Sequence, residues 1–289
     1  MTAPTGRIGV LTSYVDATAG MIRKCDDLEE HGIPVMWDSG AFSVWRAGKT
    51  IDVDEHARWV RDRQRAGSTA RYVALDVILS GDKSLENWRR QTDLGAMVEP
   101  TVHYGEPLRL VEQYVSGGAH WVNVGGLAQR SNPKSERDKA LAFFAAVAKA
   151  CGDDVKLHGL GATHPAIAWS VPYDACDSIY WRRPGWGTLP LFDPRVGDWR
   201  RLPVRMDRRQ PPKKGWRELW DHAAWVREEY GSEPAEWHVS NPEVYRLSIE
   251  SHRRYAVWIA ERHDRDVVVY LAGGASEAER VKEAVCGAS

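Results

Sequence analysis

Residues 97–126, MVEPTVHYGEPLRLVEQYVSGGAHWVNVGG, contain the pattern that decides the fold class. An apolar, β-branched run at 97–103 ends in a histidine, a helix-like segment follows at 107–116, and a second apolar run at 120–124 precedes two glycines. A strand, a polar turn, a helix and a second strand make up the βαβ unit of a parallel sheet. This stretch therefore predicts two neighbouring parallel strands joined by a crossover helix.

The same alternation extends in both directions from this stretch. Seven runs predict strands, at 7–11, 34–38, 72–78, 97–103, 120–124, 155–158 and 177–181. Five segments between them predict helices, at 54–66, 84–95, 107–116, 135–150 and 164–171. Seven strands within about 180 residues, with no Gly-x-Gly-x-x-Gly turn after the first, favour a (β/α)8 TIM-like barrel over an open doubly wound sheet.

The C-terminal part departs from this alternation. Residues 185–215 are rich in proline and arginine, which predicts an irregular basic insertion after the seventh strand. The segments after it predict a helix at 216–230, a strand near 237–239, a helix at 242–262, a strand at 267–271 and a last helix. Either late strand is able to close the barrel. We expect the whole chain, 1–289, to form a single barrel domain with extra C-terminal helices.

The composition is typical of a folded, soluble protein. Of the 289 residues, 43% are hydrophobic and 27% are charged, which excludes the disordered, collagen-like and disulfide-scaffold classes. No apolar run reaches the roughly 18 residues of a membrane span, and residues 1–10 lack the layout of a signal peptide. The sequence thus predicts a cytoplasmic protein with no membrane partner, whose four dispersed cysteines are reduced.

Charge is unevenly distributed along the chain. The net charge is −1, which predicts no polyanion partner for the protein as a whole. Residues 181–217, however, contain eleven basic and three acidic side chains, a local excess of eight positive charges. Such a segment favours contact with the phosphates of a nucleic acid. The candidates for these contacts are Arg182, Arg183, Arg200, Arg201, Arg208 and Arg209.

Polar residues and glycines stand at the C-terminal ends of five predicted strands. These ends are Asp38-Ser39-Gly40, Asp76, His103, Gly125-Gly126 and His158-Gly159. In a (β/α)8 barrel all of them open onto one face, where the active sites of this fold lie. Each also has a simpler interpretation as a helix cap, a turn or a core histidine, so the evidence is their coincidence. Asp177, a third carboxylate, begins an apolar stretch and is placed least securely by the pattern.

Four motifs resemble those of the queuine/archaeosine tRNA-guanine transglycosylases. DSGAF at 38–42 resembles the Asp-Ser-Gly-Gly-Phe signature of that family, and VGGLA at 124–128 resembles its Gly-Gly-Leu-Ala loop. LHGLGATHP at 157–165 resembles the Gly-(Val/Ile)-Gly-x-Pro turn, and DACDS at 174–178 resembles the Asp-x-Phe-Asp-Cys stretch. The motifs occur in the order that the family has, which is more specific than any one of them.

The resemblance implies a base-exchange reaction and a role for each residue of these motifs. Asp177 stands where the family has its nucleophile, Asp38 is the expected acid and base, and Asp76 is expected to contact the Watson–Crick edge of the purine. The remaining base-binding candidates are Ser39, Gly40, Phe42, His103, Gly125, Gly126, His158 and Gly159. A covalent aspartyl-glycosyl intermediate allows one base to replace another without ATP, a metal or any other cofactor.

Two departures from the family pattern bear on the substrate. The region after Asp177 lacks the Cys-x-Cys-x-x-Cys zinc motif of the tRNA enzymes, and His103 stands where they have a base-contacting Gln. Because it lacks the zinc module, the chain resembles the phage and bacterial DpdA-type branch. That branch implies the replacement of guanine in DNA by a free 7-deazaguanine base, in the host cytoplasm if a phage encodes the chain. Because the target base must leave the helical stack, Phe42, Trp45 and Tyr104 are stacking candidates.

Three alternatives stay open from the sequence. In the first, the substrate is tRNA instead of DNA. In the second, the chain is a barrel enzyme for small phosphorylated metabolites, with the glycines of 125–126 and 159–161 forming a phosphate cup. In the third, the chain is a non-catalytic nucleic-acid-binding protein, for which Asp177 is dispensable.

Overall fold

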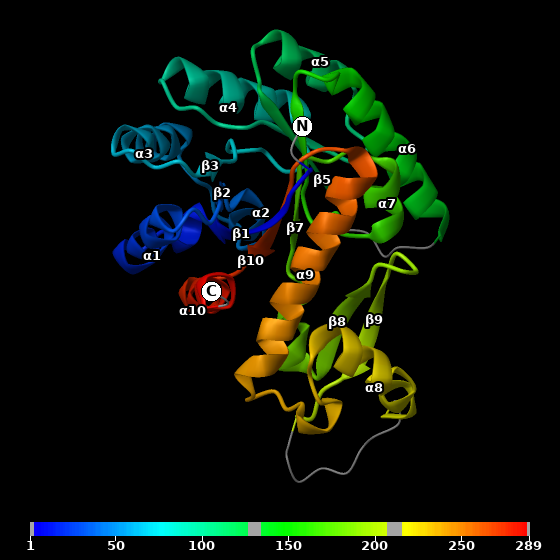
Figure 1. Ribbon diagram of the computed structural model, residues 1–289. Helices are drawn as coiled ribbons and strands as arrows, with labels where there is room; N and C mark the ends of the chain where they lie inside the picture. Colours follow the sequence, from blue (N-terminus) through cyan, green and yellow to red (C-terminus); the bar gives the residue numbers. More distant parts are fainter. Residues whose placement is uncertain (1–2, 127–133, 207–215, 288–289) are drawn as a thin grey trace.

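Eight parallel strands form one strongly curled sheet in the computed structural model, which describes residues 3–126, 134–206 and 216–287 (Figure 1). Along the sheet the strands follow the order β3-β2-β1-β10-β7-β6-β5-β4. Their bounds are β1 Gly6–Ser13, β2 Val35–Asp38, β3 Arg71–Tyr72, β4 Thr101–His103, β5 Trp121–Gly125, β6 Lys156–Gly159, β7 Ala175–Ser178 and β10 Val267–Ala272. The predicted α/β class with a parallel sheet is confirmed, and the curl is consistent with a TIM-like barrel.

The two edge strands, β3 and β4, meet through an isolated parallel bridge that we call the seam. Val73, just after β3, pairs with Glu99, just before β4. The Glu99 N–H donates to the Tyr72 carbonyl, and the Ala74 N–H donates to the Glu99 carbonyl, both at 2.8 Å. The sheet therefore curls far enough for its two edges to touch.

Helices cover the outer face of the sheet and connect its strands (Figure 1). Those before the insertion are α1 Ala19–Glu30, α2 Ala41–Arg46, α3 Val53–Arg65, α4 Gly81–Asp93, α5 Arg109–Ser116, α6 Lys134–Cys151 and α7 Pro165–Ser170, with the 3-10 helix η1 Tyr14–Asp16. The five predicted helices are confirmed to within a few residues. Asp52 starts α3, because its Oδ1 accepts hydrogen bonds from the N–H groups of Asp54 and Glu55 at 2.9 Å each.

Two of the described α-helices were not predicted, the short α2 and the longer outer helix α1. The buried residues of α1, Met21, Cys25 and Leu28, do recur at helical spacing. They are separated by charged residues and include a cysteine, so the apolar stripe is too sparse to stand out in the sequence.

The strand predicted at 72–78 is wrong beyond its first residues. Past Ala74 the backbone is bound by side chains of α4 and not by a neighbouring strand. The Leu75 N–H donates to Gln91 Oε1 at 2.8 Å, and the Val77 N–H donates to Ser84 Oγ at 2.9 Å. These bonds end the sheet early and direct Asp76 away from β3.

The strand predicted at 177–181 is also shifted. The observed strand, β7, ends at Ser178, and the 3-10 helix η2, Tyr180–Trp186, takes up the apolar residues that follow. Asp177 consequently lies at the C-terminal end of a strand, like the other candidate residues, and not at the start of one. Of the two late strands, β10 enters the sheet, between β1 and β7. Residues 237–239 contribute only a bridge between His238 and Arg205.

The insertion predicted to be irregular contains an antiparallel hairpin, β8 Thr188–Asp193 and β9 Asp198–Pro203. The prolines predicted irregular structure, but a two-stranded ribbon accepts Pro190 and Pro203 at edge positions where no backbone N–H is needed to pair with a neighbouring strand. The hairpin packs with α8 Trp216–Tyr230, the 3-10 helix η3 Pro234–Glu236 and the start of α9 Pro242–His263. We call this unit the hairpin module. Its separate core consists of Leu189, Leu191, Leu202, Val204, Trp225, Val226, Tyr230, Trp237, Val244 and Leu247.

The long helix α9 joins the hairpin module to the sheet (Figure 1). It contacts β8 at one end and β1 and β10 along its length, and α10 Ala275–Cys286 packs beside it. Asn241 starts α9 by accepting a hydrogen bond from the Glu243 N–H at 3.0 Å, directly before Pro242 at the first helical position. Among the described helices, none combines the length and the hydropathy needed to cross a membrane.

Candidate active site

A cavity of about 490 Å³ opens at the C-terminal ends of the parallel strands. It brings together residues from β2, β4, β5 and β7 and from the turns that follow them. Eight of the predicted site residues line it: Asp38, Ser39, Phe42, Asp76, His103, Gly125, Gly126 and Asp177. The other three predicted residues, Gly40, His158 and Gly159, lie behind the residues that line the cavity. The sequence did not separate these supporting residues from the lining ones.

Asp38 ends β2 and faces the cavity. The N–H of Gly40 donates to its Oδ2 at 3.1 Å. Burial, together with the negative charges of Asp76 and Asp177, raises the pKa of Asp38 to about 7. Near neutral pH this side chain therefore exists in both protonated and ionised forms, as a group that gives and later takes back a proton must.

Gly40 makes the turn from β2 into α2. Its φ of 76° lies in the left-handed region, and a Cβ there would meet Ser13 Oγ at 2.7 Å. A side chain at this position is strained for both reasons. The role of Gly40 is therefore to aim Asp38 and Ser39 into the cavity and not to line it.

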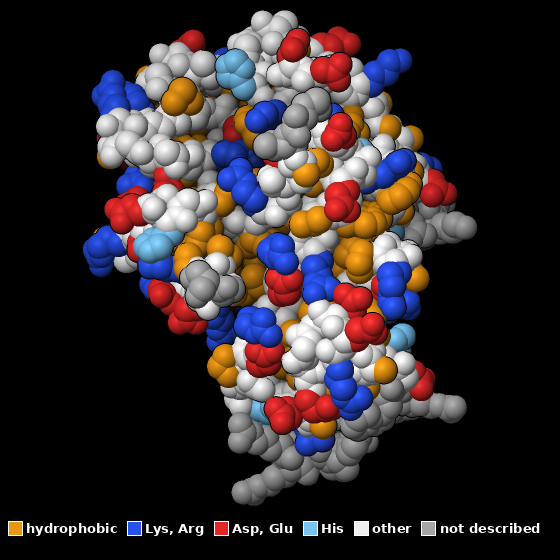
Figure 2. Space-filling model, viewed as in Figure 1, with side chains coloured by type: hydrophobic (Ala, Val, Ile, Leu, Met, Phe, Trp, Pro, Cys, Tyr) orange, Lys and Arg blue, Asp and Glu red, His pale blue; other side chains and the backbone are white. Residues whose placement is uncertain are grey.

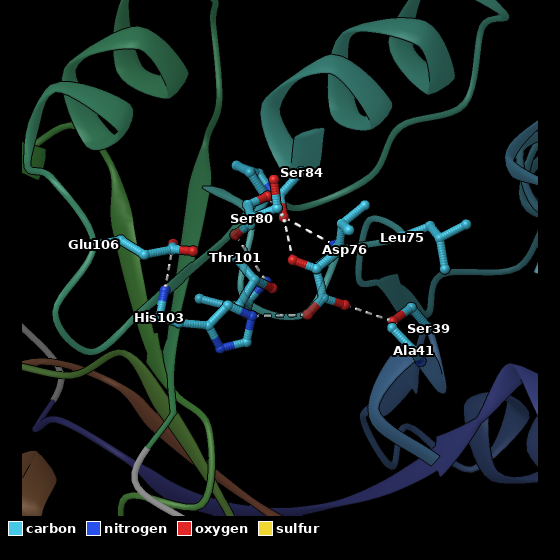
Figure 3. A network of polar contacts seen from close by, with 12 residues as sticks. Ser39, Ala41, Leu75, Asp76, Ser80, Ser84, Thr101, His103 and Glu106 are labelled. Atoms are coloured by element: carbon cyan, nitrogen blue, oxygen red, sulfur yellow. Dashed lines mark hydrogen bonds and ion pairs between the residues drawn. The ribbon is translucent and has the colours of Figure 1, made fainter. Parts of the chain in front are cut away.

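Asp76 is held between two donors that approach it from opposite sides (Figure 3). Ser39 Oγ donates to Oδ1 at 3.0 Å, and His103 Nε2 lies 2.8 Å from Oδ2. Although burial lowers the pKa of His103, the hydrogen bond and charge of Asp76, helped by Glu106, raise it overall. The raised pKa favours the protonated ring of His103 beside Asp76, and the backbone N–H of His103 donates to Glu106 Oε2 at 2.9 Å. Both oxygens of Asp76 keep a second lone pair for a ligand in the cavity.

Asp177 presents its two oxygens differently. Oδ1 accepts two hydrogen bonds, from the N–H of Gly161 at 2.8 Å and from Nε2 of His158 at 3.1 Å. Among the described residues, none donates to Oδ2. The carboxylate is therefore fixed through one oxygen while the other stays available on the cavity side.

The tautomer of His158 follows from its second partner. This histidine is fully buried, and the guanidinium of Arg71 lies 3.2 Å from its Nδ1. Arginine only donates, so Nδ1 carries no proton and Nε2 is the nitrogen that donates to Asp177. Burial and the positive charge of Arg71 lower the pKa of His158 against the opposing effect of Asp177, which keeps the ring neutral.

Arg71 and Glu99 support the candidate site from behind and were not identified from the sequence. Arg71 Nε donates to Glu99 Oε1 at 2.7 Å, and its second nitrogen, Nη2, donates to Oε2 at 2.5 Å. Its guanidinium also stacks 3.4 Å from the centre of the Trp121 ring. The available sign was a charged residue at each of two apolar runs, Arg71 directly before 72–78 and Glu99 within 97–103. Such residues inside a sheet are expensive to bury unless they are paired.

The two glycine motifs differ in their place. Gly125 and Gly126 line the cavity beside His103, and the Gly125 carbonyl accepts from the Tyr104 N–H at 2.8 Å. Gly159 instead packs inside, where an added Cβ would meet Tyr173 at 2.8 Å. Of the 157–165 motif, only Leu160, Gly161 and Thr163 reach the cavity.

The aromatic candidates also differ in whether they line the cavity. Phe42 lines the cavity and stacks on Trp45 with 6.1 Å between the ring centres. Tyr104 packs edge-on against Phe143 at 5.5 Å and does not line the cavity.

The predicted basic residues are only partly free to meet phosphates. Arg182 pairs with Glu277 at 3.2 Å, and Arg200 pairs with the buried Asp193 at 3.4 Å. Within the described residues, Arg183 and Arg201 have no ion-pair partner. Arg208 and Arg209 lie outside the described residues. Figure 2 shows basic and acidic side chains mixed over the lower part of the displayed face.

No cluster of three or more potential metal ligands occurs among the described residues. The sequence itself was compared with protein-family models and with curated proteins, and none matches.

Proposed function

We propose that the protein is a base-exchange transglycosylase, built on a (β/α)8 barrel, that replaces guanine in DNA with a 7-deazaguanine. The observation that carries this proposal is the pair of carboxyl groups on one cavity. Asp38 has a pKa raised to about 7, and Asp177 is a hydrogen-bonded carboxylate with one open oxygen. An N-glycosidic bond needs both an acid for the leaving base and a nucleophile for the sugar.

The reaction proceeds in two displacement steps. In the first, Asp177 Oδ2 forms a bond to C1′ of the target nucleotide while the bond from C1′ to the purine breaks. The purine leaves with that electron pair, and Asp38 supplies its proton. In the second step, Asp38 takes a proton from the incoming deazaguanine, whose nitrogen attacks C1′ and releases Asp177. Every atom and proton is balanced without a cofactor.

Asp76 supplies the base specificity in this scheme. Guanine presents N1–H and a 2-amino group, two adjacent donors that suit a carboxylate. Adenine presents an unprotonated N1 at the same place, which leaves the buried carboxylate without a donor. The bonds from Ser39 and His103 fix the plane of the Asp76 carboxylate and so favour one orientation of the base.

DNA is the preferred polymer because the chain resembles the DNA branch in lacking the zinc motif after Asp177, and tRNA is the alternative. A phosphorylated metabolite is disfavoured, since Asp38, Asp76 and Asp177 all line the cavity and repel a phosphate dianion.

The test is the transfer of label into a polymer. The protein is incubated with radiolabelled guanine, or with a labelled 7-deazaguanine, together with single-stranded DNA, duplex DNA or tRNA. We expect uptake into DNA, and loss of uptake in Asp177→Asn, which keeps the size of the side chain but not its nucleophilicity. Label in tRNA alone would select the alternative polymer. No uptake into any polymer under conditions where the protein is folded would reject the proposal.

A further inference from the structure

An exposed row of aromatic and basic side chains leads from the cavity to the surface. It begins directly after Asp177, on η2. Tyr180 lines the cavity, and the guanidinium of Arg183 lies 5.5 Å from the Tyr180 ring centre and 5.4 Å from that of Trp186. Arg201 of β9 approaches Tyr180 from its own strand, at 5.7 Å. We call Tyr180, Arg183 and Trp186 the stacking surface.

The stacking surface has two properties that internal packing does not explain. Trp186 is 59% exposed, although a tryptophan gains much by burial. Arg183 is exposed as well and, among the described residues, has no carboxylate partner. An open ring face beside a free guanidinium has affinity for a flat, electron-rich group carried on an anion.

A second exposed tryptophan stands near the other carboxylate. Trp45, on α2, is 47% exposed and stacks on Phe42, which lines the cavity beside Asp38. Each of the two turns that carry a proposed catalytic carboxylate is thus followed by an exposed tryptophan within ten residues. The two rings lie on different elements. Each is placed to receive a group that extends out of the cavity.

We propose that the stacking surface binds the unpaired nucleotide next to the target base, so that the DNA the protein engages is single-stranded or locally unwound. This rests on the proposed function for the identity of the polymer. A base stacks on the open face of Trp186, and the phosphate that connects it to the target nucleotide lies near Arg183. Both contacts tolerate any base, because every base has a π face and every linkage has a phosphate. A fully paired duplex keeps its bases stacked on one another and offers no free face for Trp186.

The chain offers a matched control. Trp169, in α7, is 45% exposed and has the guanidinium of Arg262 over its ring at 4.1 Å. It differs from Trp186 in position, because it packs against Trp258 of α9 and does not line the cavity. Removal of Trp169 therefore removes an exposed tryptophan and a cation–π pair without touching the proposed surface.

The experiment measures binding of one labelled oligonucleotide as a single strand, as a blunt duplex and as RNA of the same sequence. The proteins are wild type, Trp186→Ala, Trp186→Phe and Trp169→Ala, each checked by circular dichroism. We expect Trp186→Ala to raise the Kd for single-stranded DNA about 5- to 100-fold. Trp186→Phe should recover most of the affinity, and Trp169→Ala should bind like wild type.

Three outcomes would overturn the proposal: equal effects of Trp186→Ala and Trp169→Ala, a duplex that binds as tightly as the single strand, or Trp186-dependent binding that prefers RNA. Because the assay involves no chemistry, it is separable from base exchange. Trp186-dependent binding of single-stranded DNA without label transfer would reject the transglycosylase and keep the stacking surface. Label transfer into DNA that is insensitive to Trp186→Ala would do the reverse.

Discussion

At the scale of single residues, the raised pKa of Asp38 links activity to stability. Because the folded protein holds this proton more tightly than an ordinary aspartate with a pKa of 3.8, the free energy of unfolding falls as pH rises from about 4 to about 7. Below this range Asp38 is protonated in both states, and its cost disappears. The protein thus bears a destabilising, ionised Asp38 above neutral pH in exchange for a proton donor at the cavity.

Asp38→Asn is expected to slow base exchange at least a hundredfold while it stabilises the protein at alkaline pH. The amide cannot transfer the proton, but it also cannot ionise, so the variant should gain up to about 4 kcal/mol over wild type at pH 8 and little at pH 4. Urea denaturation at the two pH values measures the gain, and label transfer measures the rate. An Asp38→Asn protein with normal exchange would reduce Asp38 to a turn-forming residue.

His158 is expected to act through Asp177 by holding its Oδ1. In His158→Gln the amide still donates to Asp177 and accepts from Arg71, so we expect exchange within about tenfold of wild type. His158→Leu removes both bonds and should slow exchange about a hundredfold through misplacement of the nucleophile. Single-turnover rates, together with ¹⁵N shifts that report the protonated ring nitrogen in wild type, test this. A ring protonated on Nδ1 alone would contradict the arrangement.

At the scale of elements, neighbouring arginines of β9 differ in the partners they meet. Arg200 lies 3.4 Å from Asp193, a carboxylate that also pairs with Arg195 at 2.9 Å. The hydrogen bonds and charge of Arg195, with the charge of Arg200, lower the pKa of Asp193. Arg201 is exposed and, within the described chain, lies over Tyr180 without an ion pair. Because successive side chains of a strand point to opposite faces, one guanidinium lies beside a carboxylate and the next one does not.

Arg201→Gln is expected to weaken DNA binding and to reduce the slope of log affinity against log salt by about 0.7 on a single strand. Arg200→Gln should reduce that slope less, because Arg200 shares the carboxylate of Asp193 with Arg195. A salt series on both variants measures the difference. Equal slopes for Arg201→Gln and wild type would place the phosphates elsewhere on the protein.

The sequence predicted elements well where one apolar pattern dominates, as in β5 or α9. The prediction failed where side chains, instead of a neighbouring strand, accept the hydrogen bonds of backbone N–H groups. The strand after Tyr72 ends because Gln91 and Ser84 occupy its N–H groups, and no local pattern announces a partner from the next helix. For the candidate site, the strand-end rule located Asp38 and His103, and it reached Asp76 although β3 ends four residues earlier. It did not find Arg71 or Glu99, whose pairing depends on a contact across the sheet.

At the scale of the whole molecule, the seam is supported by the ion pair of Arg71 and Glu99, whose side chains are only 13% and 12% exposed. Arg71→Met leaves a buried, unpaired carboxylate and is expected to cost about 3–5 kcal/mol of unfolding free energy. The double variant Arg71→Met/Glu99→Leu should recover most of this loss, because no charge is left behind. Denaturant unfolding of the two proteins tests the expectation. A double variant as unstable as the single one would show that the pair does not hold the seam electrostatically.

Arg71 links the closure of the sheet to the alignment of Asp177. A transglycosylase that stalls after the first displacement leaves its polymer without a base, as damage and not as modification. In this protein the guanidinium that fastens the two edges of the sheet also supports the histidine behind the nucleophile. A molecule whose sheet has opened therefore loses the alignment of the proposed nucleophile, Asp177, at the same moment. Under the proposed function, cleavage of the glycosidic bond would thus require the intact fold, and a copy with an opened sheet would not leave sites without a base.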